Sequence, residues 1–274
     1  MKLIWLPTWR CGNYAADGGP SERCPYCSLG YREGRLTVWG QPRAAEAPAD
    51  PAIVQAWLDR EGHRFDVLDL SGGEPLNYLW LGQSLARWPR GWAITSATVQ
   101  DHRVRSLVGV DWSRCLAWTA SYHPLSGRDQ DFADGVAAVR AMGAPRVYCT
   151  VVATPATAPA IRQRAGWLEG LGFDRINLHL DMYGRGEPDF EPPAGWLVVE
   201  ETQRRRDFGP CRVHDEHVVL APNGRIYPCV EYAYRDAGSL GSVADASLSL
   251  RPGSVEHCPV PCALPCDVRK WALS

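Results

Sequence analysis

The sequence predicts an α/β protein built on a parallel sheet, and a repeated alternation of segments carries that prediction. Short apolar runs alternate with amphipathic segments over the first two thirds of the chain. The runs are rich in aliphatic and β-branched residues and end at Gly, Pro or charged residues, as strands do. Strand–helix alternation builds a parallel sheet that is covered by helices. Six units, rather than eight, predict an open or partial barrel.

We expect six strands, at residues 3–6, 66–70, 93–95, 116–121, 147–152 and 176–180. Helix-like stretches lie between them, at residues 52–60, 79–88, 132–142 and 158–171. The third stretch has Phe132, Val136, Val139 and Met142 on one face, which is the spacing of an amphipathic helix. Prolines within residues 187–195 mark a boundary. Beyond it, residues 217–220 and 225–227 flank Pro-Asn-Gly and predict a β-hairpin.

Composition narrows the class of protein. The 274 residues suffice for one large domain with a small appendage, and 45% hydrophobic residues predict a sizeable core rather than disorder. The net charge of −2 and scattered basic residues do not indicate a nucleic-acid surface. The N-terminus lacks the features of a signal peptide, and no window reaches the roughly 18 apolar residues of a membrane span. We therefore expect a cytoplasmic protein, whose ten cysteines are not structural disulfides.

Three cysteines follow the first predicted strand, at the carboxyl edge of the sheet: Cys11, Cys24 and Cys27. Thiolates bind both iron–sulfur clusters and zinc. Structural zinc usually takes four protein ligands, but no fourth Cys lies nearby and no His precedes His63. Three ligands leave one metal position open, as a catalytic [4Fe–4S] cluster requires. Zinc and unrelated thiols remain the alternatives at this point.

Two motifs resemble those of the radical S-adenosylmethionine (SAM) superfamily. Cys24-Pro25-Tyr26-Cys27 resembles the second half of its C-x3-C-x2-C motif, although twelve residues, rather than three, separate Cys11 from Cys24. Ser71-Gly72-Gly73-Glu74-Pro75 follows the second strand and resembles the superfamily's GGE(P) segment. The resemblance implies that Tyr26 lies beside the adenine of SAM. It also implies that the glycine backbone reaches the methionyl amino group, with Glu74 close by.

The resemblance also suggests residues at the ends of later strands. Ser121 and His123 follow the fourth strand, where related enzymes contact the SAM carboxylate or the substrate. Thr150 and Val152 end the fifth strand, near the expected ribose and adenine. Candidates on the substrate side are His179, Asp181 and Tyr183. The alternative for each of these positions is a capped strand end or a satisfied polar group in the core. Cys115 and Cys149 are expected to be buried packing residues, although Cys149 is also a candidate hydrogen donor, as in some radical SAM epimerases.

A second group of cysteines surrounds the predicted hairpin. Cys211 precedes it, and Gly224-x4-Cys229 closes it, which resembles the SPASM or "twitch" region that holds auxiliary clusters. A proline-rich loop adds further candidate ligands, Cys258, Cys262 and Cys266. Five cysteines suit one auxiliary [4Fe–4S] cluster, while nearby histidines keep zinc as an alternative. The resemblance thus implies a partial (β/α)6 TIM-like barrel at residues 1–190 and a small C-terminal hairpin-and-loop domain for the auxiliary cluster at residues 191–274.

The implied reaction belongs to the cofactors. A flavodoxin- or ferredoxin-type donor reduces the first cluster, and SAM is then cleaved to methionine and a 5′-deoxyadenosyl radical, which takes hydrogen from the substrate. The leading hypothesis is an oxidoreductase of a small molecule or short peptide, with net oxidation or bond formation aided by the auxiliary cluster. A second hypothesis is a peptide-modifying enzyme that cross-links or epimerises residues. From a different class, a non-enzymatic zinc-binding module remains an alternative.

Overall fold

The computed structural model describes residues 1–9, 47–180, 191–199, 217–236 and 238–245, together with Leu248, Leu250 and the backbone of three short strands within residues 29–42. Its main feature is a ten-stranded sheet with the order β10-β9-β8-β7-β6-β5-β1-β11-β12-β13. These strands are β1 (Lys2–Trp5), β5 (Val67–Leu70), β6 (Gly91–Ala97), β7 (Cys115–Tyr122), β8 (Val147–Ala153), β9 (Arg175–Leu180), β10 (Leu197–Val199), β11 (His217–Leu220), β12 (Arg225–Tyr227) and β13 (Gly241–Ser242). A separate sheet contains β2 (Leu29–Arg32), β3 (Arg35–Val38) and β4 (Gln41–Pro42).

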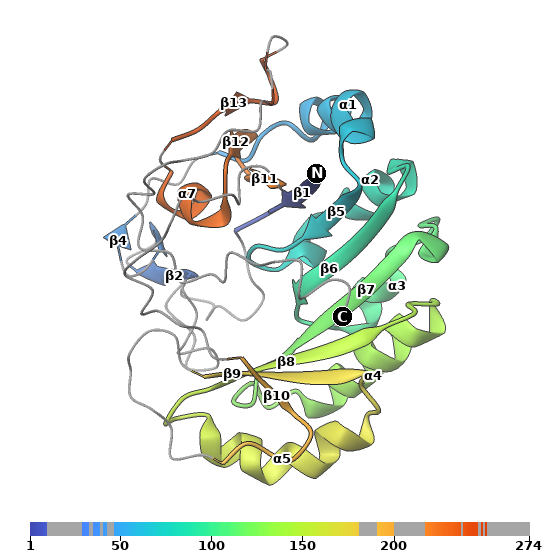
Figure 1. Cartoon of the computed structure of the whole chain (residues 1–274), viewed down its shortest axis with the longest axis vertical. Coiled ribbons are helices and arrows are strands. Elements are labelled where there is room, and N and C mark those ends of the chain that lie inside the picture. The colour runs from blue at the N-terminus through green and yellow to red at the C-terminus, as the bar shows by residue number, and fades with distance from the viewer. Residues whose placement is uncertain are drawn as a thin grey trace.

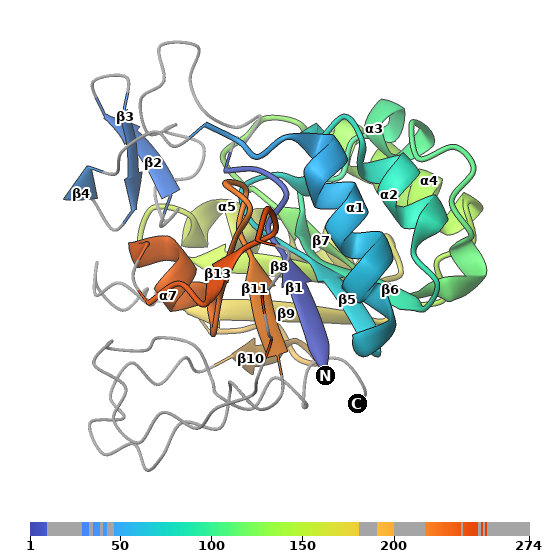
Figure 2. The ribbon, with the colours of Figure 1, turned by 90° about the horizontal axis from the view of Figure 1, so that it is seen from above.

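The strands from β11 through β1 and β5 to β10 all run parallel to their neighbours. Figure 1 shows them fanned into an open arc with α1 to α5 along its outer side, and Figure 2 shows the same arrangement from above. The six strands predicted from the sequence are β1 and β5 to β9. The prediction of an α/β fold with a partial barrel is therefore confirmed. Parallel strands end at one common edge, so the loops after β1, β5, β6 and β7 lie on the same side of the sheet.

The helices are α1 (Pro51–Glu61), α2 (Leu81–Arg87), α3 (Asp101–Arg105), α4 (Asp129–Ala141), α5 (Ala158–Gly170) and α7 (Val230–Arg235), with 3-10 turns η1 (Gly62–Arg64), η2 (Pro75–Asn77) and η3 (Trp112–Arg114). Local chemistry explains where two of them begin. The Asp50 carboxylate accepts the Ala52 N–H at 2.8 Å and caps α1. Helix α4 begins before the predicted residue 132 because Asp129 and Asp131 in its first turn complement the helix dipole. Among the described helices, none is long and apolar enough to cross a membrane.

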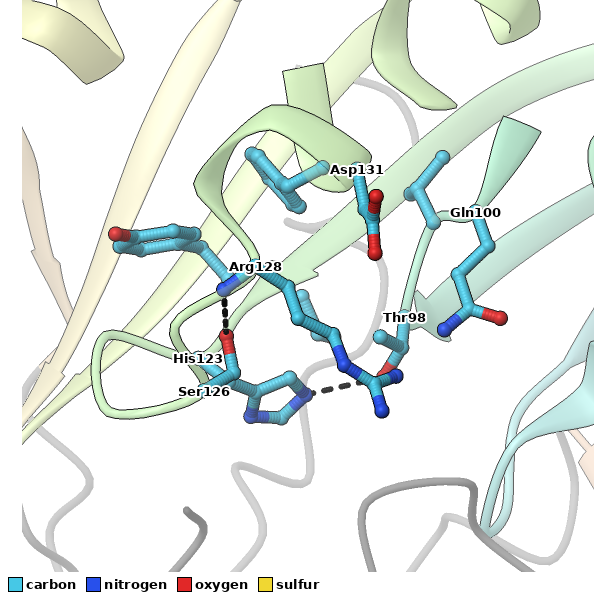
Figure 3. A pocket seen from close by; sticks show the side chains of 10 residues that line it. Thr98, Gln100, His123, Ser126, Arg128 and Asp131 are labelled. Carbon is cyan, nitrogen blue, oxygen red and sulfur yellow. Dashed lines mark hydrogen bonds between the residues drawn. The ribbon is translucent and has the colours of Figure 1, made fainter. Parts of the chain in front are cut away.

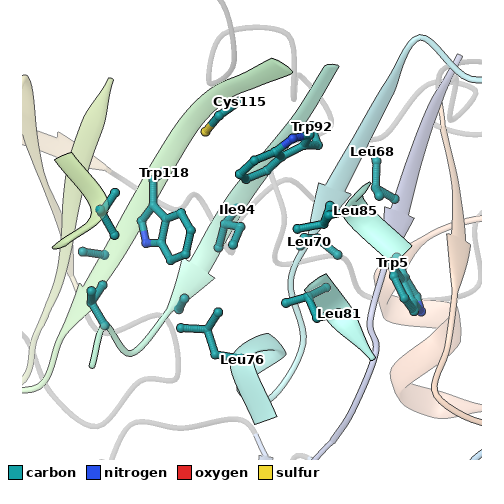
Figure 4. Packing of buried hydrophobic residues seen from close by; sticks show 14 of the residues in the cluster. Trp5, Leu68, Leu70, Leu76, Leu81, Leu85, Trp92, Ile94, Cys115 and Trp118 are labelled. Atoms are coloured by element: carbon teal, nitrogen blue, oxygen red, sulfur yellow. The ribbon is translucent and has the colours of Figure 1, made fainter. Parts of the chain in front are cut away.

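The outer face of the sheet forms the main hydrophobic core. Alternate strand residues such as Trp5, Leu70, Ile94 and Trp118 point to this face, and each is no more than 1% exposed. Figure 4 shows these side chains packed beneath the helices. The Trp118 ring stacks on Trp112 with centroids 5.7 Å apart. Large aromatic contacts of this kind hold the helices in place and keep the strand ends in fixed register.

The inner face of the arc is more polar than the outer face. Asp69, Thr119 and Asn177 occupy alternate positions that point inward, and each is less than 10% exposed. Lys2 of β1 forms an ion pair with Asp69 of β5 on this face. Burial raises the pKa of Asp69, and the Lys2 ammonium opposes that rise. Polar groups are costly to bury, so an inner face of this composition suits a space that receives polar ligands.

The predicted β-hairpin is confirmed, and its place in the sheet is informative. Strands β11 and β12 pair antiparallel around a turn in which Gly224 has φ +76° and donates its N–H to Ala221 O at 2.9 Å. Strand β11 also pairs with β1, in the register Lys2–His217 to Trp5–Leu220. The hairpin therefore extends the barrel sheet. Whether a domain boundary lies near residue 190 stays a prediction, since residues 181–190 and 200–216 lie outside the described part.

Several short elements were not predicted from the sequence. They are α3, α7, β10, β13, the sheet of β2 to β4 and the three 3-10 turns, and each element has six residues or fewer. Such lengths give no measurable helical or strand periodicity, so they are fixed by tertiary contacts. Helix α2 also begins at Leu81 rather than residue 79, because Tyr78 has extended backbone after the η2 turn.

Candidate functional site at the carboxyl edge of the sheet

The loop that follows β5 is joined by its backbone to the end of β1 and to the segment after β1. Ser71 donates its N–H to Trp5 O at 3.1 Å, and Gly73 donates its N–H to Thr8 O at 3.0 Å. Gly72 lies between these two bonds with φ +112°. A Cβ atom on Gly72 would lie 3.0 Å from the Thr8 carbonyl oxygen, so only glycine allows this approach. The Gly-Gly-Glu segment is thus fixed against the chain that leads, three residues later, to Cys11.

Glu74 fixes the same loop from the opposite side. Its side chain is 1% exposed, and its carboxylate accepts the N–H groups of Leu76, at 3.2 Å, and of Thr98, at 2.5 Å. Burial raises the pKa of Glu74 to about 7, against the opposing effect of these hydrogen bonds. The carboxylate therefore connects the loop after β5 with the loop after β6. Each of its two oxygen atoms accepts one of these backbone N–H groups. Glu74 therefore holds the two loops in position relative to each other.

A row of polar side chains crosses the inner face just before the strands end. Ser121, Thr150 and Asn177 are register partners on β7, β8 and β9, so they lie side by side on one face. Ser96 continues the row on β6, where its hydroxyl lies 3.1 Å from the Ser121 hydroxyl. Asn177 is 4% exposed, and its Oδ1 has no hydrogen-bond partner among the described residues. Val152 and His179 are paired one level nearer to the carboxyl edge. Four residues that the sequence predicted for the site, Ser121, Thr150, Val152 and His179, therefore lie next to one another on this face.

A small pocket lies where the loops after β6 and β7 meet the start of α4. Its polar lining includes Thr98, Gln100, His123 and Arg128, as Figure 3 shows. The Thr98 hydroxyl and His123 Nε2 lie 3.1 Å apart. The surrounding protein desolvates the His123 ring and lowers its pKa to about 4, so the ring is neutral at neutral pH. The Thr98 N–H donates to Glu74, and the Thr98 hydroxyl is hydrogen-bonded to His123, so these two bonds connect the pocket with the Gly-Gly-Glu loop.

The two isolated cysteines belong to the outer face. Cys115 and Cys149 are 2% and 0% exposed and form part of the main core, which confirms the prediction that they are buried. Burial raises the pKa of both thiols, that of Cys115 to about 12. Cys149 alternates with Thr150, so its thiol points to the helices and away from the polar inner face. This position suits a packing residue rather than a hydrogen donor to a ligand on the inner face.

Most of the predicted metal ligands lie outside the described residues, as do three other predicted site residues. These residues are Cys11, Cys24, Tyr26, Cys27, Asp181, Tyr183, Cys211, Cys258, Cys262 and Cys266. The described exception is Cys229, which is half-buried and precedes the first residue of α7. Within the described part, no three His, Cys, Asp or Glu side chains form a possible metal site. The ligand sets therefore stay predictions.

Sequence reasoning missed several polar residues that the fold brings to the site. Thr8 and Thr98 fix the Gly-Gly-Glu loop, and Gln100 and Arg128 line the pocket beside it. Thr98 and Gln100 directly follow β6, so the rule that ligands bind beyond strand ends applies to them as it did to Ser121. Arg128 immediately precedes α4 and carries no comparable signal in the sequence, since its place depends on how α4 packs.

The described part of the chain has the fold of a solved SAM-binding protein. No known protein family and no curated protein match the sequence. The structure of Streptococcus suis SuiB bound to S-adenosylmethionine matches with a TM-score of 0.58 at 14% identity, covering 90% of this chain and 64% of SuiB. SuiB bound to its precursor peptide SuiA matches with a TM-score of 0.56 at 14% identity, covering 90% of this chain and 63% of SuiB. Escherichia coli HemN, described as a radical SAM enzyme, gives 0.37 at 10% identity, covering 71% of this chain and 49% of HemN. The similarity to SuiB confirms the fold that the sequence motifs implied. The chain spans a little under two thirds of SuiB.

Proposed function

We propose that this chain is a radical SAM enzyme that holds a [4Fe–4S] cluster on Cys11, Cys24 and Cys27. The observation that carries the proposal is the pair of backbone hydrogen bonds from Ser71 to Trp5, at the end of β1, and from Gly73 to Thr8, in the segment after β1. The two motifs read from the sequence are 44 residues apart, counted from Cys27 to Ser71, and the fold fixes their loops against each other. A structural turn at Gly72-Gly73 alone would not require this contact with the chain that enters the cysteine loop.

The residues present fit such a cofactor. Three thiolates without a fourth leave an open iron, and the φ of +112° at Gly72 brings the loop as close to the cysteine-bearing segment as a glycine allows. The cluster and SAM together would supply a radical that takes a hydrogen atom from the substrate. In the proposal, Gly72 and Gly73 present backbone groups to the methionyl amino group. Ser121, Thr150 and Val152 then face the ribose and adenine, with Tyr26 beside the adenine.

The inner face of the arc is the proposed substrate space. Thr150, Asn177 and His179 offer hydroxyl, carboxamide and imidazole groups there, and the buried Oδ1 of Asn177 has no partner in the part of the chain that the structure describes. A buried acceptor without a partner is costly unless a ligand or water satisfies it. The polar inner face therefore favours a substrate with hydrogen-bonding groups over a purely apolar one. Asp181 and Tyr183 follow β9 in sequence and are proposed to line the same space.

For the outcome of the reaction we propose net oxidation or bond formation on a small molecule or short peptide. An auxiliary [4Fe–4S] cluster, with ligands from Cys211, Cys229, Cys258, Cys262 and Cys266, would accept the electron that the substrate radical gives up. A flavodoxin- or ferredoxin-type protein is the proposed source of the first electron. One observation favours a second candidate, a peptide-modifying enzyme that cross-links or epimerises: SuiB, which shares the fold, has been solved with its precursor peptide.

Anaerobic reconstitution tests the proposal. The reconstituted chain should bind about eight irons and form 5′-deoxyadenosine when it is given SAM and dithionite. The Cys27→Ala variant should lose this product, whereas Cys115→Ala should keep it, because Cys115 lies in the core away from the site. A chain that binds zinc and no iron, or that forms no 5′-deoxyadenosine when fully reconstituted, would refute the radical reaction. Solvent deuterium in a peptide product would favour epimerisation over cross-linking.

A further inference from the structure

Strands β9 and β10 place a polar and an apolar side chain side by side on the inner face of the arc (Figure 1). Asn177 of β9 and Leu197 of β10 are register partners, so their side chains point to the same side of the sheet. Trp196 points to the opposite side, because its Nε1 donates a hydrogen bond to Glu169 of α5 at 3.0 Å. Leu197 therefore faces the inside of the arc, where it is 42% exposed. A ligand in this space would meet an apolar surface next to Asn177.

Asn177 has an acceptor that the described part of the chain leaves unused. The residue is 4% exposed, and its buried Oδ1 accepts no hydrogen bond from any described residue. Two residues earlier on β9, the Arg175 guanidinium lies over the Tyr148 ring, 4.7 Å from its centroid, so this neighbouring cation is stacked on an aromatic ring. A buried acceptor without a donor is costly, and buried carboxamides normally have partners. The Asn177 Oδ1 therefore indicates a donor that a ligand brings.

We propose that Asn177 and Leu197 recognise a secondary amide that lies next to an apolar group of the substrate. The amide N–H donates to the Asn177 Oδ1, and the apolar group packs on Leu197. Carboxylates, phosphates, ethers and ketones carry no donor for Oδ1, and an ammonium would lose hydration beside the leucine. An amide also brings a carbonyl oxygen, which accepts from the Nδ2 donor of the same carboxamide. The proposal rests on the proposed function, since it names the chemistry that the substrate space of the radical reaction selects.

A secondary amide with an apolar neighbour has two possible sources. One is the backbone of a peptide, in which an extended residue presents its N–H and C=O groups on the same side of the chain. The other is a small molecule with a single amide and an alkyl group. Binding of either ligand needs no reduction and no cleavage of SAM, so it is measured apart from the radical reaction.

The first measurement is urea unfolding of the reconstituted full-length chain without ligand. Asn177→Leu should keep or raise the midpoint, because leucine has nearly the shape of asparagine but no acceptor to leave unpaired. Asn77→Leu is the matched control. Asn77 Oδ1 accepts a hydrogen bond from the Arg103 guanidinium, so its loss should lower the midpoint. If Asn177→Leu lowers the midpoint as much as Asn77→Leu does, then Asn177 Oδ1 has a partner within the protein and the proposal is overturned.

The second measurement compares two probes that differ at one atom. They are N-acetyl-L-leucine methylamide and its ester analogue, in which an oxygen atom replaces the leucine N–H. Binding is read as the rise in melting temperature with probe concentration. Wild type should bind the amide roughly 3- to 10-fold more tightly than the ester, as expected for one hydrogen bond. In Asn177→Leu this ratio should fall to about 1, whereas Leu197→Ala should weaken both probes and keep the ratio.

Two further probes separate the sources. A peptide source predicts that acetyl-Ala-Leu-Ala methylamide binds more tightly than the single-residue probe. A small-molecule source predicts that N-(3-methylbutyl)acetamide binds at least as tightly as the single-residue probe. The proposal is overturned if no amide probe raises the melting temperature, if wild type binds the amide and the ester equally, or if Asn177→Leu keeps the wild-type ratio. Iron content and 5′-deoxyadenosine, measured on the same samples, report separately on the radical function.

Discussion

Gly72→Ala should break the contact between the Gly-Gly-Glu loop and the segment that leads to Cys11. Gly72 has φ +112°, and a non-glycine residue held in so sparsely populated a region costs about 1–3 kcal/mol. The added Cβ would also lie 3.0 Å from Thr8 O and 3.4 Å from the Leu6 Cα and Cβ atoms. Two of these three are backbone atoms of a segment that Leu6 and Thr8 tie to Leu220 and Gly73 by backbone hydrogen bonds, so they cannot move aside as a flexible side chain would. Overpacking of this kind adds about 1–3 kcal/mol, and we expect a total loss of roughly 2–6 kcal/mol.

Urea unfolding measures this loss as a lower midpoint with an unchanged slope. Gly109→Ala is the matched control, because Gly109 also has a positive φ, +80°, but a Cβ there would have no atom within 4 Å. Gly109→Ala should lose only the free energy that a non-glycine residue costs at a positive φ, about 1–2 kcal/mol. In the folded fraction, Gly72→Ala should also bind less iron after anaerobic reconstitution than Gly109→Ala. The reasoning fails if Gly72→Ala is no less stable than Gly109→Ala and binds iron equally well.

Three further substitutions test the buried charges. The pKa of Glu74 is raised from 4.5 to about 7, so its contribution to stability is full below about pH 4.5 and is lost as the pH rises through 7. Wild type should therefore lose about 3 kcal/mol relative to Glu74→Gln over that range in urea unfolding, and parallel curves would contradict this. The pKa of His123 is lowered from 6.5 to about 4, so its contribution is full above about pH 6.5 and is lost as the pH falls through 4. Relative to His123→Gln, wild type should lose stability on acidification, the opposite slope to Glu74. Asp69→Asn should cost on the order of 3 kcal/mol, because it leaves the Lys2 ammonium unpaired near the inner face. Asp66→Asn, at an exposed ion pair with the N-terminus, should cost much less, and equal losses would refute the role of burial.

The barrel strands were predictable because each strand has one strongly apolar face. In β5, Leu68 and Leu70 alternate with the inward-facing Asp69, and in β9, Ile176 and Leu178 alternate with Asn177. A buried strand that is flanked by Gly or charge needs no long-range information to be recognised. The pairing of β11 with β1 is different, because more than 200 residues separate the two strands in the sequence. Only the packed sheet brings these two strands together. The hairpin was therefore predicted from the sequence, but its pairing with β1 was not.

The candidate site likewise contains residues that a local motif identifies and residues that only the packing of the fold brings to it. Ser71 to Pro75 form a local motif on one turn, and both its place after a strand and its glycines could be read directly. Gln100 and Arg128 are ordinary surface residues in the sequence, and they meet only because α4 packs beside the loop after β6. Glu74 shows a subtler difference. The motif implies that Glu74 lies close to SAM, which stays a prediction, and the structure adds that its carboxylate accepts the backbone N–H groups of Leu76 and Thr98. A motif thus identifies which loop matters without specifying which atoms of the loop face inward.

The C-terminal hairpin links the two groups of cysteines through the sheet. Strand β11 is hydrogen-bonded to β1, and Ile4 and Leu6 of the first segment pack with Tyr227 and the residues of α7 in a second hydrophobic cluster. The Trp9 ring, two positions before Cys11, lies 5.5 Å from the ring of Tyr234 on α7. Cys229 directly precedes that same helix. The backbones that lead to Cys11 and from Cys229 are therefore held by one set of contacts. A change in the position of α7 would therefore shift Trp9 and the backbone that leads to Cys11. Occupancy of one predicted cluster would then affect the geometry of the other.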